Sequence, residues 1–420
     1  METADGRRAT GAASDLLVPK WFEKNPDKTP EQDSKALADS VEETVHLAEP
    51  LAGASVFDLW HSLYQERVAS QPKDADDLLV RGFGVAMLER AAMDALCRLE
   101  EIPFHDALLT NVFGFDPGRI HPQLKDWDLS GSLAAKPAQS IHLRHTVGLL
   151  DALTQAELAD KDNPQDGLPT SLEEDIEKYG LRWFKIKLNG QGQADVQRLL
   201  NIAAVLKKCG VQSPQFTIDG NEQFADMDAL ADVLEAVASQ TGGADFLKGL
   251  AFIEQPLSRQ NTFNPELHTG LARVRAFAPV LVDEADFGTW AFPEAVAIGY
   301  QGISVKACKG VFRALLNRGL CDQSQGELFQ SGEDLTNLPV RALQQDLALM
   351  ASLGMEHVER NGHHYFRGLR HLTTEKAEAA LNLHPDLYCR AGDDIVLDIQ
   401  QGQLSLASLH APGFGCRLDP

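Results

Sequence analysis

Five short apolar runs in this 420-residue chain end in polar or charged residues, and they recur at intervals of one strand plus one helix. The polar ends are Lys185-Ile186-Lys187, Asp219 with Asn221, Glu254, Asp283 and Lys306. Their spacings are 32 residues (187 to 219), 35 (219 to 254), 29 (254 to 283) and 23 (283 to 306). Each spacing fits one βα unit, and (β/α) barrels carry their chemistry at the carboxyl ends of the strands. The pattern predicts an α/β barrel in which three carboxylates and three lysines converge.

The neighbouring segments support this alternation of strands and helices. Apolar periodicity predicts helices over residues 81–101, 194–209, 227–238, 312–320 and 339–353. Further strands are expected at residues 141–145 (first), 327–331 (seventh) and 363–369 (last), with a hairpin at 395–406. Such a βα rhythm favours a parallel sheet covered on both faces. We expect an N-terminal α+β domain over residues 1–138, the barrel over 139–390 and a C-terminal hairpin and tail over 391–420 that packs back on the first domain.

Charge and composition exclude several classes of partner. A formal net charge of −23 argues against nucleic acid and anionic membranes, because polyanions need a basic surface. No apolar run approaches membrane-spanning length, and the six cysteines show neither a CxxC pair nor disulfide-like spacing. We expect a cytoplasmic protein with reduced thiols that assembles as a homo-oligomer.

The alternation in WFKIKL places Lys185 and Lys187 on one face of a strand. Buried ammonium groups need nearby anions, which Asp219, Glu254 and Asp283 on the next three strands would supply. Three carboxylates in one place repel each other, so a divalent cation with oxygen ligands is expected. Mg²⁺ fits such a site, with Mn²⁺ as an alternative.

A lysine beside a metal and other cations loses proton affinity and becomes a usable base. The metal can hold a substrate carboxylate and stabilise the enediolate that forms when the α-proton leaves. Lys187 on the second strand and Lys306 on the sixth are predicted on opposite sides of the mouth. Two bases permit racemisation or epimerisation, whereas one base and one acid serve elimination or cycloisomerisation.

The segments KIKLNG, IDGN, FIEQPL, VDEA and SVKACKG, in this order, resemble the enolase superfamily, specifically its muconate lactonizing enzyme subgroup (mandelate racemase/muconate lactonizing enzyme family). The helix VAMLERAAMDALCRLEEIPFHDALL and the turn HAPGFG are similar to parts of that family's capping domain and closing turn. The resemblance implies a modified (β/α)8, TIM-type barrel of (β/α)7β order with an N-terminal capping domain. It implies Mg²⁺ ligands Asp219, Glu254 and Asp283, an acid/base pair Lys187 and Lys306, and a helper Lys185 that polarises the substrate carboxylate or tunes Lys187.

Other residues are candidates for the substrate pocket, each with a structural alternative. Glu333 and Asp334 are pocket residues or capping anions before the helix at 339–353, and His363 and His364 line the pocket or make ordinary hydrogen bonds. The family's specificity loop would lie around residues 17–28, which contain Trp21. Lys309 is interpreted as a charge at a helix start rather than a second catalytic lysine.

The resemblance also predicts that the small domain is incomplete as written. Met1 falls inside the family's second strand, which runs into a turn like Asp5-Gly6. Either the true start lies upstream, or the domain has lost an edge strand and part of its lid.

The leading hypothesis is a Mg²⁺-dependent racemase or epimerase, and the same residues would serve a dehydratase or a lactonizing cycloisomerase. A Schiff-base aldolase with Lys187 or Lys306 as nucleophile and a non-catalytic metal-binding protein are the alternatives from other classes.

Overall fold

Eight parallel strands form a closed barrel in the computed structural model, which describes residues 1–158, 166–334 and 337–420. The strands pair in chain order, and pairing of β1 with β8 closes the ring. They are β1 (Ser140–Val147), β2 (Trp183–Lys187), β3 (Gln215–Asp219), β4 (Leu250–Glu254), β5 (Val280–Val282), β6 (Gly302–Val305), β7 (Phe329–Glu333) and β8 (His357–Glu359). The α/β barrel predicted from the spacing of the polar strand ends is confirmed.

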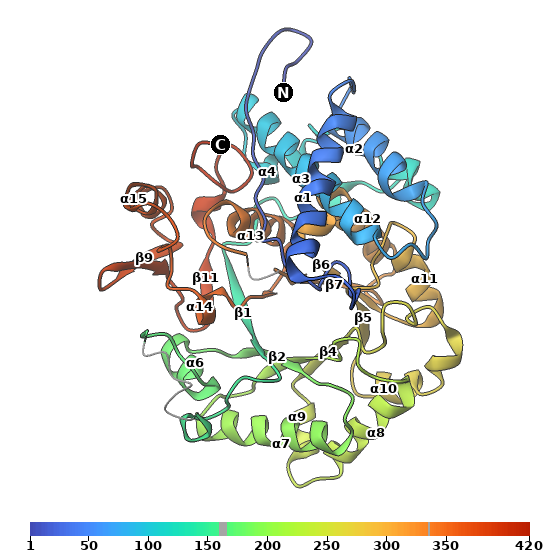
Figure 1. Cartoon of the computed structure of the whole chain (residues 1–420), viewed down its shortest axis with the longest axis vertical. Helices are drawn as coiled ribbons and strands as arrows, with labels where there is room; N and C mark the ends of the chain where they lie inside the picture. The colour runs from blue at the N-terminus through green and yellow to red at the C-terminus, as the bar shows by residue number, and fades with distance from the viewer. Residues whose placement is uncertain (159–165, 335–336) are drawn as a thin grey trace.

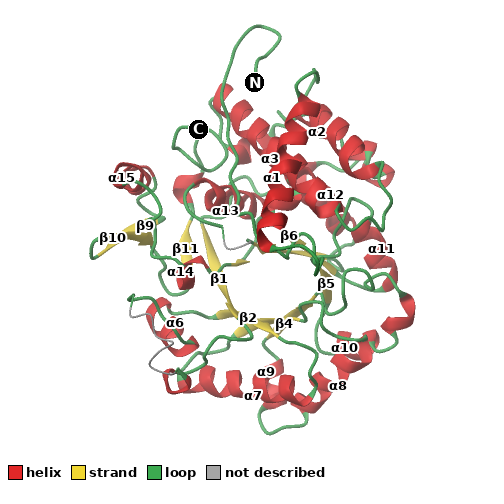
Figure 2. Ribbon diagram, in the orientation of Figure 1, coloured by secondary structure: helices red, strands yellow, loops and turns green. Residues whose placement is uncertain are grey.

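Helices connect successive strands and surround the sheet (Figures 1 and 2). They are α6 (Leu172–Tyr179), α7 (Gln193–Lys208), α8 (Met227–Ala238), α9 (Gly243–Leu247), α10 (Leu271–Arg275), α11 (Ala291–Ile298), α12 (Val311–Gln323) and α13 (Arg341–Leu353). Local sequence sets their ends: the side chain of Asp226 accepts a hydrogen bond from the backbone N–H of Ala229 at the start of α8. Gly180, with φ of 64°, ends α6 in the left-handed conformation that glycine adopts without strain.

The N-terminal region is helical. It contains α1 (Pro30–Ala48), α2 (Val56–Tyr64), α3 (Leu78–Leu99), α4 (Phe104–Leu109) and α5 (Leu129–Ser132), and α1 packs on α3. All of residues 1–138 are described, and none lies in a strand, so the α+β character expected here is not observed. The chain start instead forms a turn in which Glu2 and Arg8 make an isolated antiparallel bridge and an exposed ion pair. Such polar residues have no apolar face with which to build a sheet layer.

The C-terminal region differs from the predicted hairpin. After α14 (Gly362–Tyr365) and α15 (Thr374–Leu383), β9 (Tyr388–Ala391) and β10 (Asp394–Leu397) form an antiparallel pair. The third strand, β11 (Gln403–Ser405), does not return to β10 but pairs antiparallel with β1. The last part of the tail lies against the N-terminal region, where the rings of Phe104 and Phe414 stack with centroids 3.8 Å apart.

The prediction of a last barrel strand at residues 363–369 is wrong. The eighth strand is β8, and His363 and His364 lie on α14 beyond it. The seventh strand begins two residues later than predicted, because the turn around Gly326, with φ of 94°, delays its start to Phe329. Among the described residues, no helix combines the length and the apolarity that crossing a bilayer requires.

Candidate active site

The predicted carboxylates occupy adjacent strand ends inside the barrel. Asp219 ends β3, Glu254 ends β4, and Asp283 directly follows β5. Each is at most 2% exposed. Since parallel strands of a barrel end at one rim, consecutive strands bring these side chains to one place.

Lys185 on β2 lies in the centre of this acidic group. Its Nζ is 2.8 Å from Oε1 of Glu254, 3.1 Å from Oδ2 of Asp219 and 3.0 Å from Oε2 of Glu359. A fourth carboxylate, Glu333, lies 3.5 Å away. The ammonium group is 3% exposed, so these anions compensate its loss of hydration.

The other two predicted lysines contact different carboxylates. Lys187 Nζ donates to Oδ1 of Asn221 at 3.1 Å and lies 3.4 Å from Oδ2 of Asp219, with 29% of its side chain exposed. Lys306, directly after β6, is buried, lies 3.1 Å from Oδ1 of Asp283 and pairs with Glu333. Of the three lysines, Lys187 is therefore the one that solvent or substrate reaches most readily.

Three carboxylates could share a cation. Oxygens of Glu254, Asp283 and Glu333 lie within 4.8 Å of one another, and all three residues are buried. Oε2 of Glu254 is buried without a hydrogen-bond partner among the described residues. An oxygen-only ligand set with an unsatisfied carboxylate oxygen fits a hard cation such as Mg²⁺. The group contains two of the three predicted ligands; Asp219 instead contacts Lys185 and Lys187.

Electrostatics in the site are dominated by these buried carboxylates. Burial lowers the pKa of Lys185, but attraction to Asp219, Glu254, Glu333 and Glu359 outweighs it and raises this pKa well above its ordinary value. The pKa of Lys306 is raised in the same way, through Asp283 and Glu333.

The two central glutamates shift in opposite directions. Burial and repulsion from Glu333 raise the pKa of Glu254 well above its usual range. Burial also disfavours the charged form of Glu333, but Lys185, Lys306 and Arg144 outweigh it and hold the pKa of Glu333 well below its usual range. Burial also lowers the pKa of Lys187, but attraction to Asp219 outweighs it and raises this pKa. The protein alone therefore keeps all three lysines protonated, contrary to the lowered proton affinity predicted for a lysine base, which requires additional positive charge beside it.

Sequence reasoning did not single out two charged groups at this site, Arg144 and Glu359, and it assigned a third, Lys309, only to a helix start. Arg144 on β1 donates to Oε1 of Glu333 at 2.9 Å, and Glu359 on β8 contacts Lys185. Lys309 stands just before α12, as expected, yet it is buried, with its Nζ 3.4 Å from Oδ1 of Asp283 and 3.0 Å from Oδ2 of Asp286. The available signal for Glu359 was position alone, because it is the last residue of its strand.

Of the candidate pocket residues, Glu333 and Trp21 contact the lysines of the site, whereas Asp334 contacts an arginine. Glu333 lies at the centre of the site, whereas Asp334 forms a buried ion pair with Arg360 at 2.5 Å. Neither caps α13, which begins at Arg341. Trp21 places its ring 5.3 Å from Nζ of Lys306.

His363 and His364 are not in the barrel mouth. They face His145 and Asp175 at the outer side of β1.

Comparison with known proteins supports the fold. No family model and no curated relative matches the chain. Muconate lactonizing enzyme from Pseudomonas putida has 15% identity and a TM-score of 0.59, with 100% of this chain and 90% of that chain covered. Dipeptide epimerase from Cytophaga hutchinsonii, complexed with Mg and the dipeptide D-Ala-L-Val, has 15% identity and a TM-score of 0.56, with coverage of 99% and 86%.

A third similar structure is the 3,6-anhydro-D-galactonate cycloisomerase from Zobellia galactanivorans, with 13% identity, a TM-score of 0.57 and coverage of 99% and 89%. At these identities the similarity establishes architecture and leaves the reaction open, because one barrel fold supports many chemistries. The chain therefore has the fold shared by these cycloisomerases and epimerases, as the motif resemblance predicts.

Proposed function

We propose that the protein is a Mg²⁺-dependent enzyme of the enolase superfamily that removes the proton α to a substrate carboxylate, as a racemase or epimerase. The observation that carries the proposal is the convergence of Lys187, Lys306 and the strand-end carboxylates in one barrel mouth. Asp219, Glu254 and Asp283 would hold the metal, which when bound supplies the positive charge that stabilises an enediolate.

The protein side chains would divide the proton transfers between them. Lys187, in its neutral form, would take the α-proton on Nζ, and Asn221 would orient that nitrogen through the 3.1 Å contact. Lys306, held protonated by Asp283 and Glu333, would donate its proton to the other face of the same carbon. One proton is taken and one is given, so the product is the opposite configuration at that carbon.

The same residues support a second outcome. If Lys306 instead protonates a departing hydroxyl after the α-proton is taken, the reaction is a dehydration. If ring closure of an unsaturated substrate by its own carboxylate forms the enediolate, protonation of the α-carbon gives a cycloisomerisation. Cycloisomerases among the similar structures make this the second candidate. A Schiff-base aldolase is disfavoured, because it has no use for three convergent carboxylates. Lys306 is also paired with two of them, whereas a nucleophilic lysine must be neutral. A non-catalytic metal-binding role would leave the paired lysines without a purpose.

Exchange of the α-proton in D₂O tests the whole class, since every enolisation outcome includes it. We would screen N-acyl amino acids, dipeptides and acid sugars by mass spectrometry and NMR in the presence of Mg²⁺. Lys187→Ala and Lys306→Ala should each abolish turnover, while one of them retains exchange from a single enantiomer.

The matched control is Lys208→Ala, which removes an exposed lysine paired with Glu173 on the barrel surface and should remain active. Full activity of both active-site variants would refute the two-base mechanism. Trapping of a ketoacid by borohydride on Lys187 or Lys306 would favour the aldolase instead.

A further inference from the structure

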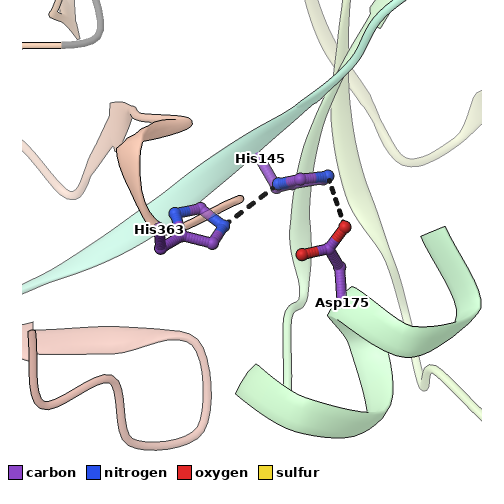
Figure 3. A group of neighbouring side chains, drawn as sticks. All are labelled: His145, Asp175 and His363. Atoms are coloured by element: carbon purple, nitrogen blue, oxygen red, sulfur yellow. Dashed lines mark hydrogen bonds and ion pairs between the residues drawn. The ribbon is translucent and has the colours of Figure 1, made fainter. Parts of the chain in front are cut away.

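A second group of metal-ligating side chains lies outside the barrel mouth (Figure 3). It consists of His145 on β1, Asp175 on α6 and His363 on α14, all buried. Nδ1 of His145 lies 3.1 Å from Nε2 of His363, and Nε2 of His145 lies 3.5 Å from Oδ2 of Asp175. One ligand atom from each residue falls within 4.8 Å of the other two.

This cluster is separated from the active site by the barrel wall. Side chains alternate along β1, so His145 points away from its neighbours Arg144 and Thr146. Arg144 and Thr146 reach inward to Glu333 and Glu359, whereas His145 faces α6. The cluster therefore lies between the sheet and its surrounding helices, beside the β1–β8 pairing that closes the barrel.

Hydrogen bonds within the protein do not satisfy the charge of Asp175. Its side chain is 1% exposed, and neither carboxylate oxygen has a hydrogen-bond partner among the described residues. Within that part of the chain no lysine or arginine pairs with it; its ion-pair contacts are His145 and His364. Nδ1 of His364 lies 2.8 Å from Oδ2, but this contact lacks hydrogen-bond geometry, and 3.5 Å to His145 is longer than a normal hydrogen bond. A buried carboxylate in this state needs a cation, which a metal ion or a protonated His364 would supply. Burial lowers the pKa of His364, but attraction to Asp175 outweighs it and raises this pKa.

We propose that His145, Asp175 and His363 bind a divalent transition-metal ion, for which Zn²⁺ is the best fit, with His364 or a water molecule as fourth ligand. In a tetrahedral zinc site with Zn–N bonds of about 2.0–2.1 Å, ligand nitrogens lie about 3.3 Å apart. The 3.1 Å between Nδ1 of His145 and Nε2 of His363 is close to that value. Oδ2 of Asp175 lies 3.5 Å from the opposite nitrogen of His145, so the carboxylate would turn toward the ion on binding. Imidazole ligands select Zn²⁺ over Mg²⁺, whereas the all-carboxylate mouth favours Mg²⁺.

One of the three ligands borders a cavity, and a bound ion would have a structural effect. His363 lines a cavity of about 90 Å³ that Tyr179, Gly362 and Phe366 also line. Bound there, the ion would join the first βα unit to the segment after β8 and so reinforce the point at which the barrel closes. Metal binding that occurs only in the folded state adds to stability by mass action.

Cobalt replacement tests the site independently of enzymatic activity. The full-length protein is stripped with a chelator, saturated with Mg²⁺ to fill the barrel mouth, and titrated with Co²⁺ while visible absorption is recorded. The proposal requires one Co²⁺ per chain with the intense absorption of tetrahedral coordination, displaced by Zn²⁺. His363→Ala and Asp175→Asn should each weaken Co²⁺ binding at least 100-fold and remove the rise in Tm that Zn²⁺ causes.

Two control variants locate the signal. His268→Ala removes a buried histidine that hydrogen-bonds the carbonyl of Asn264, far from the cluster in sequence, and should leave Co²⁺ binding unchanged. Asp283→Asn should also leave it unchanged. An absorption band that disappears in Asp283→Asn but survives in His363→Ala and Asp175→Asn would place the ion in the barrel mouth and overturn the proposal. Absence of a tetrahedral Co²⁺ spectrum in the wild-type protein would also overturn the proposal. This measurement needs no variant, so it remains decisive if a variant fails to fold.

Discussion

The ammonium group of Lys306, at the end of β6, pairs directly with the carboxylate of Glu333, at the end of β7, and both side chains are at most 2% exposed. Each charge is thus stabilised mainly by other charges rather than by water. Glu333 also contacts Lys185 and Arg144, so one buried carboxylate connects two lysines and one arginine of the candidate active site.

Removal of either partner of this pair should destabilise the protein, and removal of both should cost less than the sum. Loss of one partner leaves an uncompensated buried charge, which costs about 3–5 kcal/mol. We therefore expect Lys306→Met and Glu333→Gln each to lower the free energy of unfolding by that order, and the double variant to show a coupling of about 1–3 kcal/mol. Denaturant unfolding in the presence of a chelator gives the free energy of unfolding of the wild type, the two single variants and the double variant. The exposed pair Lys208–Glu173 serves as the control, with an expected coupling below about 1 kcal/mol.

Metal affinity distinguishes between two sets of ligands. The motif resemblance implies Asp219, Glu254 and Asp283, whereas the carboxylate oxygens that lie closest together belong to Glu254, Asp283 and Glu333. Both Asp219 and Glu333 pair with two cationic side chains, so charge pairing does not decide between them. On the motif resemblance we expect Asp219→Asn to weaken Mn²⁺ binding and Glu333→Gln to retain most of it. Loss of groups that only support ligands costs about 10–100-fold, so loss of a true ligand should exceed that. Electron paramagnetic resonance of free Mn²⁺ gives both affinities, and the reverse order would assign Glu333 as the ligand.

The barrel and the location of Asp219, Glu254 and Asp283 follow from local patterns. Strand alternation, a polar residue at the end of each apolar run and βα spacing are all visible within about 30 residues of sequence. The helix predicted at residues 227–238 matches α8, since its apolar face and the Asp226 cap are both local signals.

The parts that were missed depend on distant partners. The three-residue strand β8 carries His357 and Glu359 and is followed by Arg360, so it reads as a polar loop. Those charges are acceptable in the interior only because Glu359 meets Lys185 and Arg360 meets Asp334. The placement of His363 likewise depends on a distant residue, since its imidazole contacts that of His145, 218 positions away. The hydrophobic periodicity of the sequence does not predict contacts between residues so far apart in the chain.

Stability should fall with rising pH because of Glu89 on α3. Burial raises the pKa of Glu89 to about 8, although the backbone N–H of Phe312 donates to it and Arg90 and Arg313 lie near. The unfolded carboxyl loses its proton near its ordinary pKa of 4.5, while the folded one keeps it until about 8. Between these values the unfolded state binds fewer protons, so stability decreases as pH rises, and below 4.5 the effect is absent.

Glu89→Gln should remove this dependence, because the amide keeps the acceptor for Phe312 and never ionises. The gain in Tm of the variant over wild type should grow from pH 5 to pH 8, since a tenfold difference in proton affinity between the folded and unfolded states corresponds to about 1.4 kcal/mol. Calorimetric scans across this range provide the test, with exposed Glu66→Gln as the control. Parallel Tm profiles for wild type and Glu89→Gln would contradict the assignment.

Arg259 should hold the segment 17–28 over the candidate active site. Its guanidinium donates to the backbone carbonyls of Trp21 at 2.8 Å and Phe22 at 3.1 Å, and it pairs with Glu222 at 2.9 Å. Trp21 in turn places its ring near Lys306, while Phe22 is 2% exposed and packs on Phe83.

Arg259→Ala should therefore release this segment without unfolding the barrel. Hydrogen bonds from a charged group contribute about 1.5–3 kcal/mol, so the open population should rise at least about tenfold. Tryptic cleavage after Lys20, Lys24 or Lys28 should accelerate by the same factor, because cleavage follows the open population when opening is fast. Mass spectrometry of the fragments over time measures these rates. Arg273→Ala, which removes an equally charged but partly exposed arginine paired with Asp228, Asp232 and Glu235, should leave them unchanged. Equal cleavage rates in the Arg259 and Arg273 variants would show that the buried contacts of Trp21 and Phe22, rather than Arg259, keep the segment closed.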